Sequence, residues 1–280
     1  MVERLTDSKP TVAVVVPNLN QGSYLEEALV SIISQDGIDI YLAVLDAGSS
    51  DNSRSIINKY EKYIHYWRSH QDDGQAAAIN EGVFNLPKTD YVCWLNADDV
   101  FMEHGLSDMV QFLEKHKNLV MVYAQAYITD MNNTIIQSYP TEDFSILALS
   151  NNCIICQPAT LIRREVWEKV EGVNPSFHMC MDYDLWWRIS EQGKLGYLRK
   201  YTAFSRDHKN TKTRNNQELH FSEAFNLLKK YLGYVPWGWV KSYAIMIFSK
   251  EGREKGILSK IQINFFALKL FLKYRFNNYN

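Results

Sequence analysis

The sequence predicts an α/β fold in which a mostly parallel, Rossmann-like central sheet is flanked by helices. Three observations support this prediction. Short apolar runs rich in β-branched residues, such as Thr11–Val16, are typical of strands that are covered on both faces. Segments with apolar residues at helical spacing follow these runs. A polar loop containing Gly or Asp separates each run from the next helical segment, as expected where parallel strands alternate with crossover helices.

The first half of the chain repeats this alternation from one element to the next. Pro17 is expected to end the first strand, and Ser23 with Glu26 has the spacing of a capping box at the start of a helix. The apolar patterns then predict strands at 11–16, 40–45, 63–67 and 91–95, and helices at 23–33, around 56–60 and at 76–84.

The second half is less regular but keeps the same types of element. Asp184 and Arg188 lie four residues apart on an expected helix, so they are expected to form a structural pair, whereas Asp182 at the start of that helix is available to face a cleft. The patterns predict helices at 106–116, 164–170 and from about 182, a short strand after Thr160, and strands at 119–127 and 197–204.

Charge is distributed unevenly along the 280 residues. Met1–His208 contains 17 Lys and Arg against 28 Asp and Glu, a net charge of −11, whereas Lys209–Asn280 contains 13 against 4, a net charge of +9. We therefore expect an acidic body with a basic tail that can meet an anionic surface. The acidic body does not favour a nucleic-acid partner.

The four cysteines do not form a recognisable metal or redox set. Cys153 and Cys156 make one Cys-x-x-Cys in an apolar context, without a second pair. We expect buried thiols in a reducing compartment. The sequence begins without the basic and apolar regions of a signal peptide, and it has no run of roughly 18 apolar residues. These features favour a cytoplasmic location.

Oxygen-bearing side chains gather directly after the strand expected at 91–95. Asn96, Asp98 and Asp99 follow it, and ligands of open α/β sheets bind beyond the carboxyl ends of the strands. Carboxylates in such a place favour a hard divalent cation; a solvated Asp-Asp turn that caps the next helix is the alternative. The first strand is followed by neither a Gly-x-Gly-x-x-Gly fingerprint nor a Gly-rich phosphate loop, so a metal fits the task of holding phosphates.

These segments together resemble glycosyltransferase family 2, the inverting, nucleotide-sugar-dependent enzymes with a GT-A fold. The resemblance covers about residues 11–210 and implies the GT-A form of the α/β fold. It rests on blocks that are weak singly but stand in family order: Val16-Pro17-Asn18 with Asn20, Asp46 to Asp51, Asp72 to Gln75 with Asn80-Glu81-Gly82, Leu95 to Asp99, Gln157-Pro158-Ala159, Asp182 to Trp186, and His208.

The resemblance implies roles for several of the matching residues. Asp98 would bind Mn²⁺ or Mg²⁺ at the diphosphate and His208 would complete the metal site, although a surface imidazole is an alternative for His208. Asn96 stands where the family's Asp-x-Asp motif has its first Asp, so one negative charge is missing. Asp46 as a turn former and Asp99 as a helix cap remain alternatives. The expected nucleotide-sugar-binding residues are Pro17, Asn18, Asn20, Asp46, Ser49, Asp72, Gln75, Asn96, Ala97 and Asp99.

Asp182 matches the family's catalytic base. The resemblance implies a single displacement at the anomeric carbon, in which Asp182 takes the proton of the attacking acceptor hydroxyl. Met181 stands where the family often has Glu, which leaves a more apolar wall. Gln157 and Trp186 are expected on the acceptor side, with core packing as the alternative for Trp186.

The tail forms a separate expected unit. We predict a catalytic domain at 1–215 and a helical, basic and aromatic extension at 216–280, with a helix at Asn216–Tyr231 and an aromatic turn at Tyr234–Trp239. The segment Ile257–Phe276 mixes Lys with Ile, Leu and Phe, but Lys260 and Lys269 fall on opposite sides of an ideal helix. A helix on anionic lipid and a helix packed on the body or on another subunit of a homo-oligomer both fit.

The sequence therefore favours a cytoplasmic glycosyltransferase, peripheral to the membrane if the tail binds lipid. The expected donor is a UDP-, dTDP- or GDP-sugar, with UDP preferred, and the expected acceptor is a hydroxyl of a bacterial surface glycan or lipid-linked glycan, which implies polysaccharide biosynthesis for the cell envelope. An inactive nucleotide-sugar-binding module in a glycan-assembly complex is an alternative. A nucleotidyltransferase would need a Gly-rich, basic phosphate loop, which Val16–Gly22 lacks.

Overall fold

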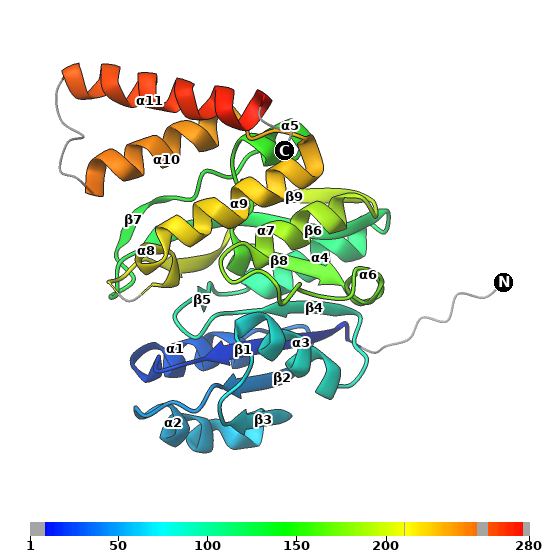
Figure 1. Ribbon diagram of the computed structural model, residues 1–280. Coiled ribbons are helices and arrows are strands. Elements are labelled where there is room, and N and C mark those ends of the chain that lie inside the picture. Colours follow the sequence, from blue (N-terminus) through cyan, green and yellow to red (C-terminus); the bar gives the residue numbers. More distant parts are fainter. Residues whose placement is uncertain (1–8, 210, 251–256, 277–280) are drawn as a thin grey trace. The chain divides into compact units, whose positions relative to one another are not determined.

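The computed structural model describes residues 9–209, 211–250 and 257–276 (Figure 1). The chain divides into two compact units. Unit 1 comprises residues 1–142 and 155–208, and unit 2 comprises residues 143–154 and 209–280. The domain boundary at residue 216 stays a prediction.

Unit 1 is built from strands, helices and two short 3-10 turns. Its elements are β1 (Thr11–Asn18), α1 (Gly22–Ile33), β2 (Asp39–Asp46), α2 (Ser53–Tyr60), η1 (Glu61–Tyr63), β3 (Tyr66–Ser69), α3 (Gln75–Asn85), β4 (Tyr91–Trp94), β5 (Val100–Phe101), α4 (Gly105–Lys115), β6 (Leu119–Thr129), β7 (Ile135–Ser138), η2 (Gln157–Ala159), β8 (Thr160–Arg163), α6 (Arg164–Lys169), α7 (Met181–Ser190) and β9 (Lys194–Arg206).

The described strands form one mixed sheet in the order β3-β2-β1-β4-β8-β6-β9-β5, with β7 paired to β6. Strands β3, β2, β1 and β4 are parallel neighbours, as the βαβ pattern predicts. Beyond β4 the sheet is mixed: β8 is antiparallel to both β4 and β6, whereas β9 is parallel to β6. The α/β prediction is confirmed, and its parallel part is the half that carries the first four strands.

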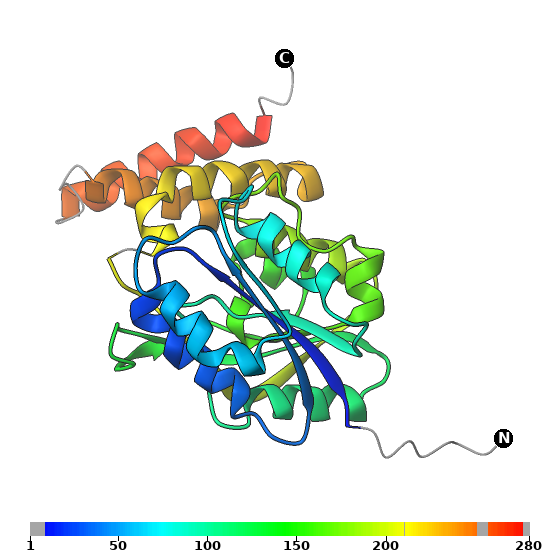
Figure 2. The ribbon, with the colours of Figure 1, turned by 90° about the horizontal axis from the view of Figure 1, so that it is seen from below.

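Helices cover both faces of this sheet, as Figures 1 and 2 show. On one face, apolar residues of α1, α2 and α4 belong to one buried cluster that also contains Val12, Val14 and Val16 of β1. On the other face, α3 lies on β1 and β2, and Trp94 of β4 packs against Trp167 of α6 and Trp186 of α7. Because β1 and β4 are covered on both sides, their residues form continuous apolar runs rather than alternating patterns.

Gly82 allows α3 to approach the sheet closely. A Cβ at this position would lie 2.6 Å from Val15 Cγ1 and 2.7 Å from Leu45 Cδ2, far inside van der Waals contact. Its neighbours in the Asn80-Glu81-Gly82 block also hold the scaffold: the Asn80 amide exchanges two hydrogen bonds with the backbone of Val173, and Glu81 accepts from Arg68. This family block therefore holds α3 in place.

Several local sequence-based predictions are wrong. Ser23 and Glu26 form no capping box, because Glu26 instead pairs with Lys59 and Tyr60 of α2. Strand β1 continues through Pro17 to Asn18, in register with β2. The segment expected to begin a strand at Tyr63 is a 3-10 turn, and β3 begins only at Tyr66. Strand β5 is two residues long, and strand β7 is exposed along its whole length, so neither has an apolar pattern that predicts a strand.

Unit 2 is helical. Its elements are α5 (Ile146–Asn151), α8 (Lys212–Asn215), α9 (Gln217–Leu232), α10 (Trp237–Lys250) and α11 (Ile257–Phe276). The helix α10 packs on α9, α5 and α11, and the Trp239 indole N–H donates to the Ser150 carbonyl over 3.1 Å. The aromatic turn expected at Tyr234–Trp239 is wrong in its second half, where α10 begins. In the part of the chain that the structure describes, no helix is both long and apolar enough to cross a membrane.

Candidate active site

The carboxyl ends of the parallel strands bring the sequence-predicted residues of the first two loops together. Register pairs Asn18 at the end of β1 with Asp46 at the end of β2, and the Asn18 amide donates to Asp46 Oδ1 over 2.6 Å. The Oδ1 atom of Asn18 is buried without a hydrogen-bond partner. A buried acceptor without a partner is costly, so this atom is a natural contact for a ligand donor. Pro17, which precedes it, is buried within β1.

Asp46 is held in a cage of donors. It is fully buried and accepts from the Ser49 backbone N–H over 3.0 Å, from the Ser69 hydroxyl over 2.6 Å and from the Ser49 hydroxyl. Burial acts to raise the pKa of Asp46, but hydrogen bonds from Ser49, Ser69 and Asn18 outweigh it and hold the pKa below its ordinary value. The carboxylate therefore stays charged and orders the loop after β2, as the turn-forming alternative requires.

Asn20 joins the loops after β1 and β2. Its φ of +53° places it in the left-handed region that Asn tolerates better than most residues. Its backbone N–H donates to the Ser49 hydroxyl over 2.8 Å, and its Oδ1 accepts from the Ser50 N–H over 2.9 Å. The two loops are thus one hydrogen-bonded unit beside Asn18.

Asp72 is fixed in the loop after β3. Its Oδ2 accepts from the Arg68 guanidinium over 2.9 Å, and its Oδ1 accepts from the Gly74 N–H over 2.9 Å. Arg68 is 7% exposed and also binds Glu81 and the Asp46 carbonyl, so it connects the second and third loops. Sequence reasoning missed Arg68, because a lone Arg in a short strand carries no motif.

Asn96 is the centre of a second group, at the end of β4. Its Oδ1 accepts from the Gln75 amide over 2.8 Å, and its Nδ2 donates to Asp99 over 3.1 Å and to Gln157 Oε1 over 3.2 Å. Gln157 in turn donates to the Trp94 carbonyl over 2.8 Å. Gln75, Asn96, Asp99 and Gln157 are therefore brought together, and the adjacent Ala97 is buried.

Asp98 faces the end of β9. Its Oδ2 lies 3.1 Å from His208 Nε2 and 3.3 Å from the Gln21 amide nitrogen. The His208 ring stacks on Tyr24, with ring centroids 4.8 Å apart. The surface-imidazole alternative for His208 is wrong, since this residue is 8% exposed and contacts Asp98. Gln21 lies in the polar loop after β1, and Tyr24 lies in the first turn of α1. Their position next to a strand end is the sequence signal that could have identified them as site residues.

Arg206 holds the backbone that carries Asp98 and Asp99. Its backbone N–H donates to Asp99 Oδ1 over 3.0 Å, and its guanidinium donates to the Asp98 carbonyl over 2.9 Å while pairing with Glu27. Burial, together with the charge of Asp98, raises the pKa of Asp99 to about 8. In this structure Asp99 accepts hydrogen bonds from the Arg206 backbone N–H and from the Asn96 amide.

The donor set at Asp98 fits a divalent cation only in part. Among the residues that the structure describes, no group of three or more His, Cys, Asp or Glu side chains is arranged to hold a metal. Asp98 and His208 supply one carboxylate and one imidazole that already meet at one point. Two protein ligands fit a metal whose other positions are filled by phosphate oxygens and water, as Mg²⁺ and Mn²⁺ sites commonly are.

Asp182 lies in the first turn of α7 and is partly exposed, with its Oδ1 accepting from the Tyr183 N–H over 2.8 Å. The helix is attached to the sheet one turn later, where Trp186 stacks on Trp94 with ring centroids 6.0 Å apart. Trp186 is fully buried, so the structure gives it no surface for an acceptor sugar, and the core-packing alternative describes it. The expected pair of Asp184 and Arg188 is confirmed, with a 2.7 Å contact.

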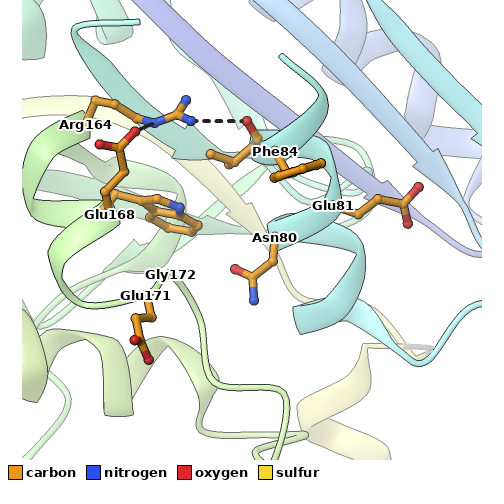
Figure 3. Close-up of a pocket in the computed structure, with 9 residues that line it drawn as sticks. Asn80, Glu81, Phe84, Arg164, Glu168, Glu171 and Gly172 are labelled. Carbon is orange, nitrogen blue, oxygen red and sulfur yellow. Dashed lines mark hydrogen bonds and ion pairs between the residues drawn. The ribbon is translucent and has the colours of Figure 1, made fainter. Parts of the chain in front are cut away.

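A pocket of about 530 Å³ lies elsewhere in unit 1, along α3 and α6. Figure 3 shows Asn80 and Phe84 on one side, with Arg164 and Glu168 facing them. Arg164 donates to Glu168 over 2.9 Å and to the Val83 carbonyl over 3.5 Å. Its guanidinium therefore binds other residues of the pocket wall. None of the sequence-predicted site residues lines this pocket.

Comparison with known proteins gives one consistent family. The family model described as "Glycosyl transferase family 2" matches residues 13–171. An uncharacterized glycosyltransferase of Nostoc sp. is 30% identical over 212 residues, which span 70% of this chain and 65% of that protein. A chondroitin synthase of Pasteurella multocida is 24% identical over 193 residues, 68% of this chain but only 20% of the synthase.

Solved structures share the fold at low sequence identity. S. aureus TarS 1-349 in complex with UDP-GlcNAc superimposes with a TM-score of 0.66 at 15% identity, covering 94% of this chain and 81% of the TarS 1-349 chain. The mannosyltransferase PcManGT from Pyrobaculum calidifontis, in complex with GDP-Man and Mn²⁺, gives 0.60 at 16% identity, covering 98% and 86%. These likenesses confirm the GT-A fold, and together with the family match and the ordered loops at the strand ends they lead to one conclusion: this chain belongs to glycosyl transferase family 2.

Proposed function

We propose that this chain is an inverting glycosyltransferase that moves a sugar from a nucleoside diphosphate donor, preferably a UDP-sugar, to a hydroxyl of a glycan or lipid-linked glycan. The observation that carries this proposal is the convergence of three strand-end loops on Asn18, Asp46 and Asp72, with Asp98 and His208 in contact at the next strand. Family membership supports a glycosyltransferase activity in general. The identity of the donor, the identity of the acceptor and the inversion of configuration are proposed here.

The first part of the proposal is the nucleoside site. Asn18 presents a buried Oδ1 that lacks a partner, and Asp72 is oriented by Arg68 and Gly74. A carboxylate in this position would accept a hydrogen bond from the ring N–H of uracil or thymine, which supports a UDP- or dTDP-sugar. Two structures of S. aureus TarS 1-349 with the same fold are complexes with UDP-GlcNAc and with UDP, which supports UDP among these donors.

The second part is the diphosphate site. Asp98 and His208 would hold Mn²⁺ or Mg²⁺, and the mixture of one oxygen and one nitrogen ligand favours Mn²⁺, because Mg²⁺ takes oxygen ligands almost exclusively. When bound, the cation would offset the negative charge of the leaving diphosphate. Arg206 and Gln21 would keep Asp98 in place through its backbone and its side chain.

The third part is the transfer itself. Asp182 would accept the proton of the acceptor hydroxyl while the hydroxyl oxygen forms a bond to the anomeric carbon. The bond from that carbon to the diphosphate oxygen breaks at the same time, and its electron pair leaves with the diphosphate. Attack from the face opposite the leaving group inverts the anomeric configuration. Gln157, fixed between Trp94 and Asn96, would border the acceptor side.

A polysaccharide acceptor is supported by the relatives named chondroitin synthase and hyaluronan synthase, both from Pasteurella multocida. We place the reaction in cell-envelope polysaccharide synthesis at the cytoplasmic side. Homo-oligomer formation remains part of this proposal.

The test is a screen of UDP-, dTDP- and GDP-sugars with Mn²⁺ present or chelated, against glycan and lipid-linked acceptors. We expect nucleoside diphosphate release that needs both an acceptor and a divalent cation, with a product whose NMR coupling constant shows inversion. A product with retained configuration would overturn the mechanism. Donor binding with no transfer to any acceptor would instead identify an inactive nucleotide-sugar-binding module.

A further inference from the structure

Helix α11 presents an apolar stripe on its outer face. Ile261, Phe265, Leu268 and Leu272 are 60%, 72%, 46% and 46% exposed. Their spacing of four, three and four residues aligns them along one side of the helix over about 16 Å. The opposite side buries Ile263 and Ala267, and α11 packs on α10. The helix therefore has two apolar faces, and unit 2 covers only one of them.

Lysines border the outer stripe on both sides. At 100° per residue, Lys260 lies about 100° to one side of the stripe, and Lys269 and Lys273 lie about 80° to 120° to the other. All three are exposed. The opposite placement of Lys260 and Lys269, which obscures the periodicity in the sequence, is the arrangement that a helix lying flat in an interface requires. The segment 257–276 contains no Asp or Glu.

An aromatic side chain extends this surface onto α10. Trp237 is 38% exposed, and its ring meets the edge of Phe271 of α11 with centroids 5.7 Å apart. Tryptophan is enriched where hydrocarbon meets headgroups, because its ring is apolar and its N–H is polar. Trp237 thus adds an interfacial side chain next to the α11 stripe.

We propose that the outer face of α11 docks on an anionic lipid bilayer. Ile261, Phe265, Leu268 and Leu272 enter the boundary between headgroups and acyl chains, while Lys260, Lys269 and Lys273 reach the lipid phosphates. The net charge of +9 over Lys209–Asn280 adds a longer-range attraction to the same surface. This inference concerns where the protein is held and goes beyond the proposed transfer reaction.

A second copy of this chain is a poorer occupant of the same stripe. Two identical faces would bring lysine rows against lysine rows without any acidic residue on α11 to compensate. Four partly exposed side chains also supply less apolar area than the roughly 800 Å² per partner that a stable protein interface buries. A lipid surface meets both conditions, since it is negatively charged and accepts a narrow apolar strip.

The test is co-sedimentation of the full chain with phosphatidylcholine vesicles that contain or lack phosphatidylglycerol. We expect binding to the anionic vesicles that weakens as salt rises. Phe265→Ser/Leu268→Ser should lower the partition coefficient at least about 10-fold. Lys260→Gln/Lys269→Gln/Lys273→Gln should lower it roughly 10- to 100-fold on anionic vesicles only.

Two matched variants control for these changes. Phe84→Ser/Ile136→Ser removes one exposed aromatic and one exposed aliphatic side chain from unit 1, and Lys62→Gln/Lys115→Gln/Lys169→Gln removes three exposed charges there. Both should bind vesicles like the wild type. Wild-type protein that ignores anionic vesicles, or stripe variants that bind normally, would overturn the proposal. So would a wild-type dimer that the stripe variants convert to monomer without any vesicle binding. The assay uses no sugar donor, so its outcome is independent of the transfer reaction.

Discussion

The amide of Asn96 satisfies a set of neighbours that a carboxylate could not. It donates to Asp99 and to Gln157 Oε1 while it accepts from Gln75. An Asp at this position would place a second carboxylate about 3 Å from Asp99, whose own pKa is already raised to about 8 by burial and by Asp98. The departure from the Asp-x-Asp pattern is therefore matched to the local hydrogen bonds, and Asp98 is left as the carboxylate in contact with His208.

The proposed base gives the sharpest test of an individual residue. Asp182→Asn keeps the size and polarity of the side chain but cannot accept the acceptor proton, so kcat should fall roughly 10²- to 10⁴-fold. The Kd for the donor, measured by calorimetry, should stay within about threefold because Asp182 lies outside the nucleotide-binding loops. Glu191→Gln, at an exposed carboxylate at the other end of α7, should leave kcat unchanged. Wild-type turnover of Asp182→Asn would exclude it as the base.

The proposed metal ligand should affect binding as well as turnover. Asp98→Asn removes the carboxylate whose Oδ2 lies 3.1 Å from His208 Nε2. The Kd for the donor in Mn²⁺ should rise at least as much as the roughly 10- to 100-fold caused by loss of an outer-shell partner. With a chelator present, mutant and wild type should bind the donor equally weakly. Asp73→Asn, an exposed carboxylate in the loop after β3, serves as the control. Equal Mn²⁺ dependence in Asp98→Asn and wild type would refute the assignment.

At the scale of elements, α7 shows how a buried charge fixes a helix. Asp184 has no exposed surface, and Arg188 lies 2.7 Å from it while also donating to the Gly172 carbonyl. Arg188→Met would remove the positive charge that pairs with the buried Asp184 carboxylate, so the free energy of unfolding should fall by about 3–5 kcal/mol. Lys194→Met, an exposed substitution nearby in sequence, should change it by less than about 0.5 kcal/mol. Urea denaturation measures both, and equal stabilities would show that the pair is dispensable.

The sequence predicts an element correctly where a single local property, such as burial on both faces or helical spacing, explains its residue pattern. The run Val12–Val16 is apolar because β1 is covered on both faces, and the pairing of Asp184 with Arg188 follows from helical spacing. Long-range partners were not predictable. Glu26 does not cap α1, because its carboxylate pairs with Lys59 of α2 instead.

The same distinction applies to the site. Asn18, Asp46, Asp72 and Asp98 follow strand ends, so topology alone gathers them at one edge. The sequence places Trp186 near the site, because it follows Asp182 by four residues. It does not indicate that the Trp94 ring stacks on Trp186. Arg206 stands next to a strand end as well, yet its contact with the Asp98 backbone depends on β9 returning to that edge.

At the scale of the whole molecule, the two units separate the proposed chemistry from the proposed lipid surface. Every sequence-predicted site residue, from Pro17 to His208, belongs to unit 1, and the α11 stripe belongs to unit 2. Each unit buries its own apolar residues: Val14 and Trp94 are examples in unit 1, and Leu228 and Val240 in unit 2. A ligand that binds one unit therefore need not stabilise the other.

Hydrogen exchange can measure this separation directly. Donor and Mn²⁺ at 100 times the Kd should stabilise unit 1 by about 2.7 kcal/mol, because only the folded site binds them. Exchange in β1 and β4 should slow by roughly 100-fold wherever it proceeds through unfolding of unit 1. Amides of α10 and α11 should keep their rates, since no proposed ligand contact lies in unit 2, and chelation of the metal should reverse the effect in β1 and β4. Equal slowing in all four elements would mean that the two units unfold together, and slowing confined to α10 and α11 would move the donor site out of the strand-end loops.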